Sequence, residues 1–152
     1  MLLVQSCSKS KNKAVEPVPA LELYSGYFYK IIKKAMREGD LRSDFDLCIL
    51  SAEHGLIEPT TEITTYDRRM DAERAIELAD QVTSELVSVI AESNHDEVVV
   101  NMGEEYRAAI DGIASKVDAN VHYISGKLGE RGNILKRIIR TSANRTLPTN
   151  AA

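Results

Sequence analysis

Four short apolar segments, separated by longer stretches of helical periodicity, constrain the fold of this chain more than any other feature. They cover residues 2–6, 45–50, 97–101 and 120–124, and they are rich in β-branched side chains. Because most positions in each segment are apolar, we expect strands that are buried on both faces. That pattern is typical of a parallel sheet.

The stretches between these segments carry apolar residues three or four positions apart, as amphipathic helices do. They cover residues 24–39, 71–90, 106–113 and 134–139, and Asp71 is a good N-cap for the second. The alternation predicts an α/β fold with a mostly parallel sheet of four or more strands and helices on both faces. This is a Rossmann-like three-layer arrangement.

The chain of 152 residues has the length of one domain. We expect that domain to occupy residues 1–141 and to be followed by a flexible tail at 142–152, where small and polar residues follow the last helical pattern. No apolar run is long enough to span a membrane, and the first residues do not resemble a signal peptide. We therefore expect a cytoplasmic protein without membrane association, in which Cys7 and Cys48 are reduced.

The net charge of −4 is unevenly distributed along the chain. Residues 1–42 carry eight Lys or Arg and four acids, residues 53–105 carry three and fourteen, and residues 126–145 carry six and one. Most of these charges fit a solvated surface. If the fold brings the two basic ends together, however, they would attract a phosphate-bearing ligand.

In open parallel sheets, ligands bind outside the carboxyl ends of the strands, where the loops diverge. This rule selects four polar loops at residues 6–13, 51–56, 101–106 and 125–131. We expect their side chains to line one cleft, with these residues foremost: Lys9, Ser51, Glu53, Asn101, Glu105 and Arg131. The histidines lack metal-ligand spacing, so we predict neither a metal nor another cofactor.

The first two loops contain the candidates for catalysis. Lys9 could bind an anion or act as a nucleophile with a lowered pKa, and the alternative is a solvated basic loop. Cys7, beside Ser8, could be a thiolate with His54 as its base, although a buried filler is the more common role. Glu53 or His54 could serve as a general acid or base. Since neighbours on an extended segment point in opposite directions, we expect only one of the two in the cleft.

A long segment at residues 58–69, without evident secondary structure, follows the second loop. Tyr66 could stack on a base there, and Arg68 or Arg69 could meet phosphate. The alternative is that Tyr66 only anchors the segment and that Asp67 pairs with an arginine.

Several motifs at these loops occur in a recognisable order. Residues 6–9 (Ser-Cys-Ser-Lys) precede residues 49–59 (Ile-Leu-Ser-Ala-Glu-His-Gly-Leu-Ile-Glu-Pro), and residues 66–68, 100–106 and 130–132 follow. Together they resemble the YaaA family of peroxide-stress proteins over most of residues 1–140, with Cys7 where that family usually has proline. The form with His before Gly55 resembles most closely a group of shorter bacterial, archaeal and phage domains. The chain is much shorter than YaaA and lacks its additional segments.

The resemblance extends, more distantly, to the lysine-bearing domain of archaeosine synthase, which modifies a deazaguanine base. It implies a pocket for a nucleobase. Our first hypothesis is therefore an enzyme that binds or modifies a nucleobase, either free or in nucleic acid. Lys9 would be its ligand or nucleophile, Asn101 would read the base edge, and Tyr66 would stack on the base. The remaining ligand-binding candidates are Cys7, Ser8, Ser51, Gly55, Glu105, Tyr106, Lys127 and Arg131.

Two other classes of function remain open. One is a noncatalytic DNA- or RNA-binding module of a stress response, which would bind with a steep salt dependence and no turnover. The other is a small accessory domain whose partner carries the chemistry. The sequence does not set the oligomeric state.

Overall fold

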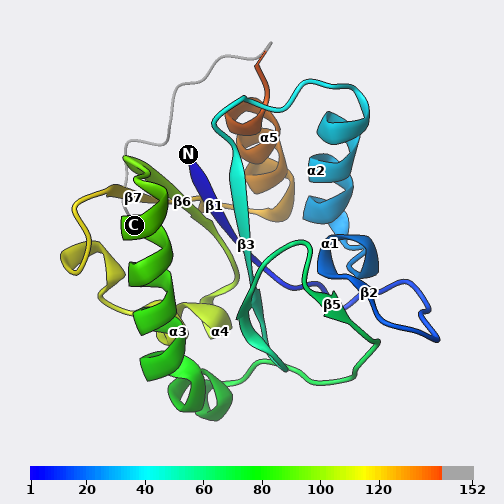
Figure 1. The fold of residues 1–152 in the computed structure, drawn as a ribbon, viewed down its shortest axis with the longest axis horizontal. Helices are drawn as coiled ribbons and strands as arrows, with labels where there is room; N and C mark the ends of the chain where they lie inside the picture. The colour runs from blue at the N-terminus through cyan, green and yellow to red at the C-terminus, as the bar shows by residue number, and fades with distance from the viewer. Residues whose placement is uncertain (142–152) are drawn as a thin grey trace.

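A five-stranded sheet forms the centre of the computed structural model, which describes residues 1–141 (Figure 1). In spatial order its strands are β4 (Gly55–Ile57), β3 (Asp46–Ser51), β1 (Leu2–Ser6), β6 (Glu97–Asn101) and β7 (Asn120–Tyr123). β3, β1, β6 and β7 are parallel, whereas β4 runs antiparallel to β3. All four predicted strands are confirmed. The predicted tail at 142–152 lies outside the described residues.

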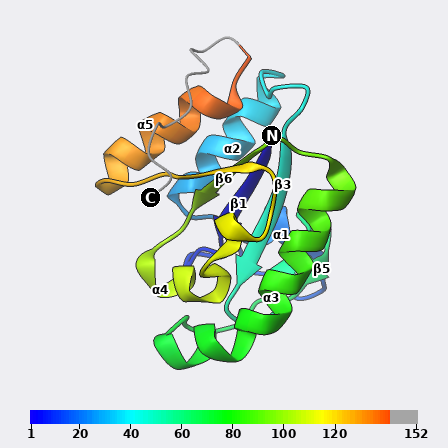
Figure 2. The same cartoon turned by 90° about the vertical axis from the view of Figure 1, so that its left-hand side faces the viewer.

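Helices cover both faces of this sheet (Figure 2). α2 (Tyr27–Arg37) and α5 (Leu128–Ile139) pack side by side on one face. On the other face lies α3 (Ala72–Ser93), whose first turn is capped by the Asp71 carboxylate at 2.8 Å from the Arg74 amide. The predicted three-layer α/β class is therefore confirmed.

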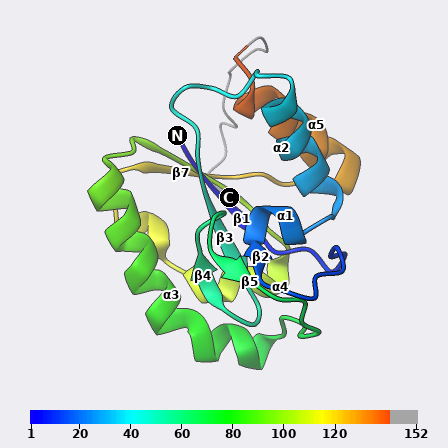
Figure 3. The same ribbon diagram turned by 45° about the vertical axis from the view of Figure 1, so that its right-hand side comes forward.

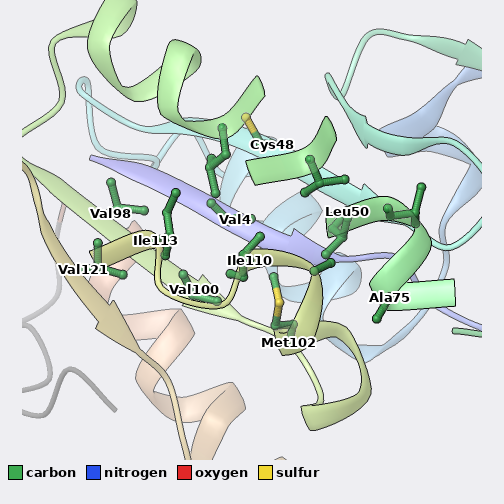
Figure 4. Packing of buried hydrophobic residues seen from close by; sticks show 14 of the residues in the cluster. Val4, Cys48, Leu50, Ala75, Val98, Val100, Met102, Ile110, Ile113 and Val121 are labelled. Atoms are coloured by element: carbon green, nitrogen blue, oxygen red, sulfur yellow. The ribbon is translucent and has the colours of Figure 1, made fainter. Parts of the chain in front are cut away.

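Each face of the sheet has its own apolar core. Val4, Leu50 and Val100 point towards α3, as Figure 4 shows, and Leu3 and Val99 point towards α2 and α5. All five are at most 1% exposed. Because successive side chains of a strand alternate between faces, two buried faces explain why the strand segments are apolar throughout.

Two segments differ from the sequence prediction. The expected helix at residues 106–113 is divided into α4 (Glu104–Arg107) and two 3₁₀ turns, Ala108–Ile110 and Ile113–Ser115. Gly112 separates these turns with φ +76°, a left-handed conformation that ends a helix.

The long segment at residues 58–69 is also more regular than expected (Figure 3). Within it, β5 (Glu62–Ile63) pairs antiparallel with β2 (Val18–Pro19), which leads into the short helix α1 (Ala20–Leu23). The amide of Ala20 also donates to the Thr61 carbonyl at 2.8 Å. These backbone bonds attach the segment to the region that follows β1 and fix its position at the carboxyl edge of the sheet.

Candidate functional site

A cleft of about 660 Å³ lies at the carboxyl edge of the parallel strands. Its walls come from the end of β1 and the loop after it, the segment before α3, and the starts of α2, α4 and α5. It is lined by Gln5, Ser6, Cys7, Ser8, Lys9, Lys11, Tyr27, Phe28, Tyr29, Thr65, Tyr66, Asp67, Arg68, Arg69, Met70, Gly103, Glu105, Tyr106, Leu128 and Arg131. We call this feature the cleft.

The cleft has the opposite charge from the chain as a whole. Its lining contains the cations of Lys9, Lys11, Arg68, Arg69 and Arg131 but only the carboxylates of Asp67 and Glu105, whereas the chain carries a net charge of −4. The carboxyl ends of the parallel strands bring these charged residues together from distant parts of the sequence. A concave surface with an excess of one charge sign focuses the field on a ligand of the opposite sign.

Aromatic side chains are also concentrated here. Tyr27, Phe28, Tyr29, Tyr66 and Tyr106 line the cleft, and the whole chain contains only six tyrosines, two phenylalanines and no tryptophan. Five of its eight aromatic residues therefore belong to one site. Such a lining combines apolar ring faces with hydroxyl groups, which suits a planar ligand with polar edges.

The hydroxyl of Tyr66 belongs to a buried hydrogen-bond network. It lies 2.9 Å from Ser51 Oγ and 2.7 Å from Tyr24 OH. Ser51 Oγ accepts from the amides of Glu53 at 3.2 Å and His54 at 3.0 Å. With both lone pairs in use, Ser51 can offer only its own proton to the tyrosine hydroxyls. Burial raises the pKa of Tyr24 to about 12 and raises that of Tyr66 as well, so both stay protonated at neutral pH.

Cations lie over two of the aromatic rings. Lys11 Nζ is 4.4 Å from the centre of the Tyr66 ring, and the Arg131 guanidinium is 4.8 Å from that of Phe28. These contacts hold two positive charges inside the cleft without neutralising them. They also cover a face of each ring, so a base that stacks on Tyr66 from that side has to displace Lys11.

Cys7 occupies the floor of the cleft. Its Sγ lies 3.2 Å from Tyr106 OH, and its amide donates to the Leu50 carbonyl at 2.9 Å, which fixes the thiol just beyond the end of β1. Burial and the neighbouring Cys7 raise the pKa of Tyr106. Cys7 and Cys48 are both free thiols.

A second polar chain connects α5 to β1. Arg131 donates from Nε and Nη2 to Asn101 Oδ1 at 3.1 and 2.8 Å. Asn101 Nδ2 donates in turn to Gln5 Oε1 at 2.8 Å. Burial lowers the pKa of Arg131, and Arg107 acts in the same direction while Glu105 opposes it. The guanidinium nevertheless remains charged at neutral pH.

The structure places the predicted residues in three groups. Those that line the cleft are Cys7, Ser8, Lys9, Tyr66, Glu105, Tyr106 and Arg131. Ser51 and Asn101 are fully buried next to the lining and act on it through Tyr66, Gln5 and Arg131. Those outside the lining are Glu53, His54, Gly55 and Lys127. The expected cleft thus forms, but Ser51, Glu53 and Asn101 are not on its surface.

The hairpin between β3 and β4 explains where Glu53 and His54 lie. We expected a polar loop at residues 51–56 in which the chain can turn sharply at Gly55, and Gly55, with φ +74°, pairs with Ser51 and turns the chain back into β4. Arg74 of α3 fixes this turn by donating to the carbonyls of Ala52 and Glu53 at 2.7 and 2.9 Å.

The side chains of this turn contact the rim of the cleft. Glu53 forms an exposed ion pair with Arg68 at 3.9 Å, and the His54 ring meets the edge of Tyr66 with 5.4 Å between centres. Neither residue lines the cleft, but each contacts a residue that does.

Sequence reasoning did not identify Gln5, Tyr27 and Phe28. Gln5 had a usable signal, because it is a polar residue in a segment that is otherwise apolar up to its last position. Tyr27 and Phe28 were assigned only to the periodic pattern of a helix. Their place in the cleft depends on how α2 meets the sheet, which the pattern does not contain.

Among residues 1–141, no group of three or more His, Cys, Asp or Glu side chains gathers as it would around a metal ion. Within the same residues, no helix has both the length and the apolar character needed to cross a membrane.

Comparisons with known proteins identify the family of this chain and a solved structure with a similar fold. The sequence profile of DUF6884, described as a family of unknown function, matches residues 1–137. No curated protein sequence matches the chain. The crystal structure of AF0587, a protein of unknown function, is similar with a TM-score of 0.57 and 16% sequence identity. The similarity covers 95% of this chain and 46% of AF0587, so this chain spans less than half of that protein.

Proposed function

Since this chain belongs to the family of unknown function DUF6884, we propose its function from the cleft itself: it binds a nucleobase that carries phosphate. The ligand is either a free nucleotide or one unit of a single-stranded nucleic acid. The observation that carries this proposal is the joint concentration of five aromatic and five cationic side chains in one cleft of an acidic protein.

The cations support the phosphate part of the proposal. Lys9, Arg68 and Arg69 are exposed, and they come from two segments, the loop after β1 and the segment before α3, so they can contact an anion from two sides. A guanidinium offers two parallel donors that match phosphate oxygens, and an ammonium acts as a point charge. Asp67 and Glu105 offset only part of this charge.

Size and surface chemistry support the nucleobase part. A volume of about 660 Å³ falls within the usual range of roughly 300–1,000 Å³ for small-molecule sites, which is ample for one nucleotide. Aromatic side chains stabilise a base by stacking without regard to its identity, by about 1–3 kcal/mol per base. Tyr106 and Tyr27 add such surfaces at the two sides of the cleft, on α4 and α2.

Titration with mononucleotides and short oligonucleotides at several salt concentrations tests this proposal. Since three or four cations can face one bound ligand, the logarithm of affinity for an oligonucleotide should fall with the logarithm of salt with a slope of about −2 to −4. Arg68→Gln should weaken binding and make the slope shallower. Lys136→Gln, an exposed change on α5 outside the cleft, is the matched control. If neither nucleotides nor oligonucleotides bind at low salt, the proposal is wrong.

A covalent reaction on the bound base is the second candidate. The observation that favours it is that a thiol and an amine, those of Cys7 and Lys9, line the same cleft. Intact-mass measurement of protein purified from its host would reveal a retained base or a covalent adduct. An adduct should disappear in Lys9→Arg or Cys7→Ser and persist in Lys13→Arg, because Lys13 is exposed outside the lining.

A further inference from the structure

Gln5 stands out among the residues that line the cleft, because it is a polar side chain that is only 1% exposed. It is the fourth residue of β1 and pairs in register with Asn101 of β6. A primary amide at such a position has two donor hydrogens and one acceptor oxygen to satisfy. The hydrogen-bond partners of the Gln5 amide therefore decide whether its nitrogen or its oxygen is available to a ligand.

The partners of Gln5 fix the direction of its amide group. Arginine can only donate, so the Asn101 atom that meets Arg131 must be the oxygen. The Asn101 nitrogen then faces Gln5 and donates at 2.8 Å, which requires the Gln5 oxygen at that contact. The amide nitrogen of Gln5 is turned the other way.

Among residues 1–141, that nitrogen has one distant hydrogen-bond partner. It donates to the Ser6 carbonyl at 3.4 Å, which is close to the limit for a hydrogen bond, and the same carbonyl accepts from Tyr29 OH at the shorter distance of 2.8 Å. A buried donor without a good partner is costly. It gains most from a ligand that brings an acceptor.

We propose that Gln5 is a specificity-determining residue that donates to a carbonyl oxygen on the edge of the bound base. Asn101 and Arg131 are positioning residues, because they hold the Gln5 amide in this orientation. This inference rests on the proposed function and adds the class of base: keto bases are preferred over the amino bases of the same shape. An amino group of the base in place of the keto oxygen would set its N–H donors against the N–H donors of the Gln5 amide.

Matched nucleotide pairs test the preference directly. Inosine and adenosine monophosphate differ on one edge of the base, where a keto oxygen beside a ring N–H stands in place of an amino group beside an acceptor nitrogen, and uridine and cytidine monophosphate differ in the same way. We expect the wild type to bind the keto member of at least one pair about tenfold or more tightly, since only the keto oxygen accepts from the Gln5 amide nitrogen at that position. Calorimetric titration of both pairs gives this ratio.

Two substitutions should change the ratio, although each adds a carboxylate near Arg131 and should therefore also weaken both members of a pair. Gln5→Glu replaces the donor by an acceptor of the same shape, so the preference should invert towards the amino member. Asn101→Asp places a carboxylate between Arg131 and Gln5, so that Gln5 must donate to it and turn its oxygen to the cleft. This second variant should also lower or invert the ratio, although it leaves every residue of the lining unchanged. Gln81→Glu, an exposed change on α3, is the control and should keep the wild-type ratio.

The possible outcomes distinguish the role of Gln5 from the proposed function of the cleft. If nucleotides bind the wild type but both members of each pair bind equally, the role of Gln5 is refuted while the proposed function stands. The same holds if Gln5→Glu and Asn101→Asp weaken both members by the same factor, as a purely structural role would. If no mononucleotide binds, the proposed function itself fails, and this inference fails with it.

Discussion

Replacing Asn101 by alanine should destabilise the protein strongly, although the residue lies at the edge of the cleft. Asn101 is fully buried and makes three hydrogen bonds: two from Arg131 to its oxygen and one from its nitrogen to Gln5. Truncation removes all three, and it leaves the oxygen of the buried Gln5 without its donor.

The size of the effect follows from these contacts. An unsatisfied buried acceptor costs about 1–3 kcal/mol, and a lost hydrogen bond about 1 kcal/mol. Because Arg131 is only half-buried, water can replace part of what it loses. We therefore expect Asn101→Ala to lower the free energy of unfolding by about 3 kcal/mol. For a chain of this size the melting temperature should fall by roughly 6–12 °C.

Urea denaturation followed by circular dichroism measures this loss. The slope of the free energy of unfolding against urea should stay constant while the midpoint falls. Asn120→Ala is the matched control, because Asn120 is exposed and its side chain makes one long contact of 3.4 Å to Glu97, so it should cost no more than about 0.5 kcal/mol. A loss below about 1 kcal/mol for Asn101→Ala would show that Gln5 finds another donor. That result would refute the fixed orientation of its amide.

Three further predictions concern stability. Asp71→Ala removes the N-cap of α3 and should cost about 1 kcal/mol in a melting experiment. Gly126→Ala should destabilise the protein by about 1 kcal/mol or more, because Gly126 has φ +112°. Gly129→Ala should stabilise it by roughly 0.5–1 kcal/mol, because Gly129 lies in the first turn of α5 with open space around the new methyl group. Equal effects of the two changes on stability would contradict this reasoning. Tyr24 keeps its proton in the folded protein up to a pKa of about 12 but only to about 10 when unfolded, so stability should be complete below pH 10 and fall as the pH rises towards 12. Tyr24→Phe should lose this part of the pH dependence, and an equal loss of stability between pH 10 and pH 12 in both proteins would contradict the prediction.

The location of the cleft could be predicted from the sequence, but its surface could not. Four apolar segments indicated parallel strands, and the carboxyl-end rule then selected the loops that carry Lys9, Glu105 and Arg131, which do line the cleft. Glu53 follows a strand just as closely, yet it lies outside the lining. The difference is a backbone turn stabilised by Arg74, more than twenty residues away in sequence.

The sequence by itself determined the layers of this protein, because the periodicity of apolar side chains reports which faces of strands and helices are buried. Periodicity is a local property, readable within ten or fifteen residues. The direction of the Gln5 amide was decided only by the tertiary structure, through Asn101 and Arg131, which come from two other elements of the fold. Hydrogen bonds act over about 3 Å and are selective in donor and acceptor, so they exist only once distant segments have been brought together. The sequence pattern thus located the cleft, and tertiary contacts decided which atom of the Gln5 amide is available to a ligand there.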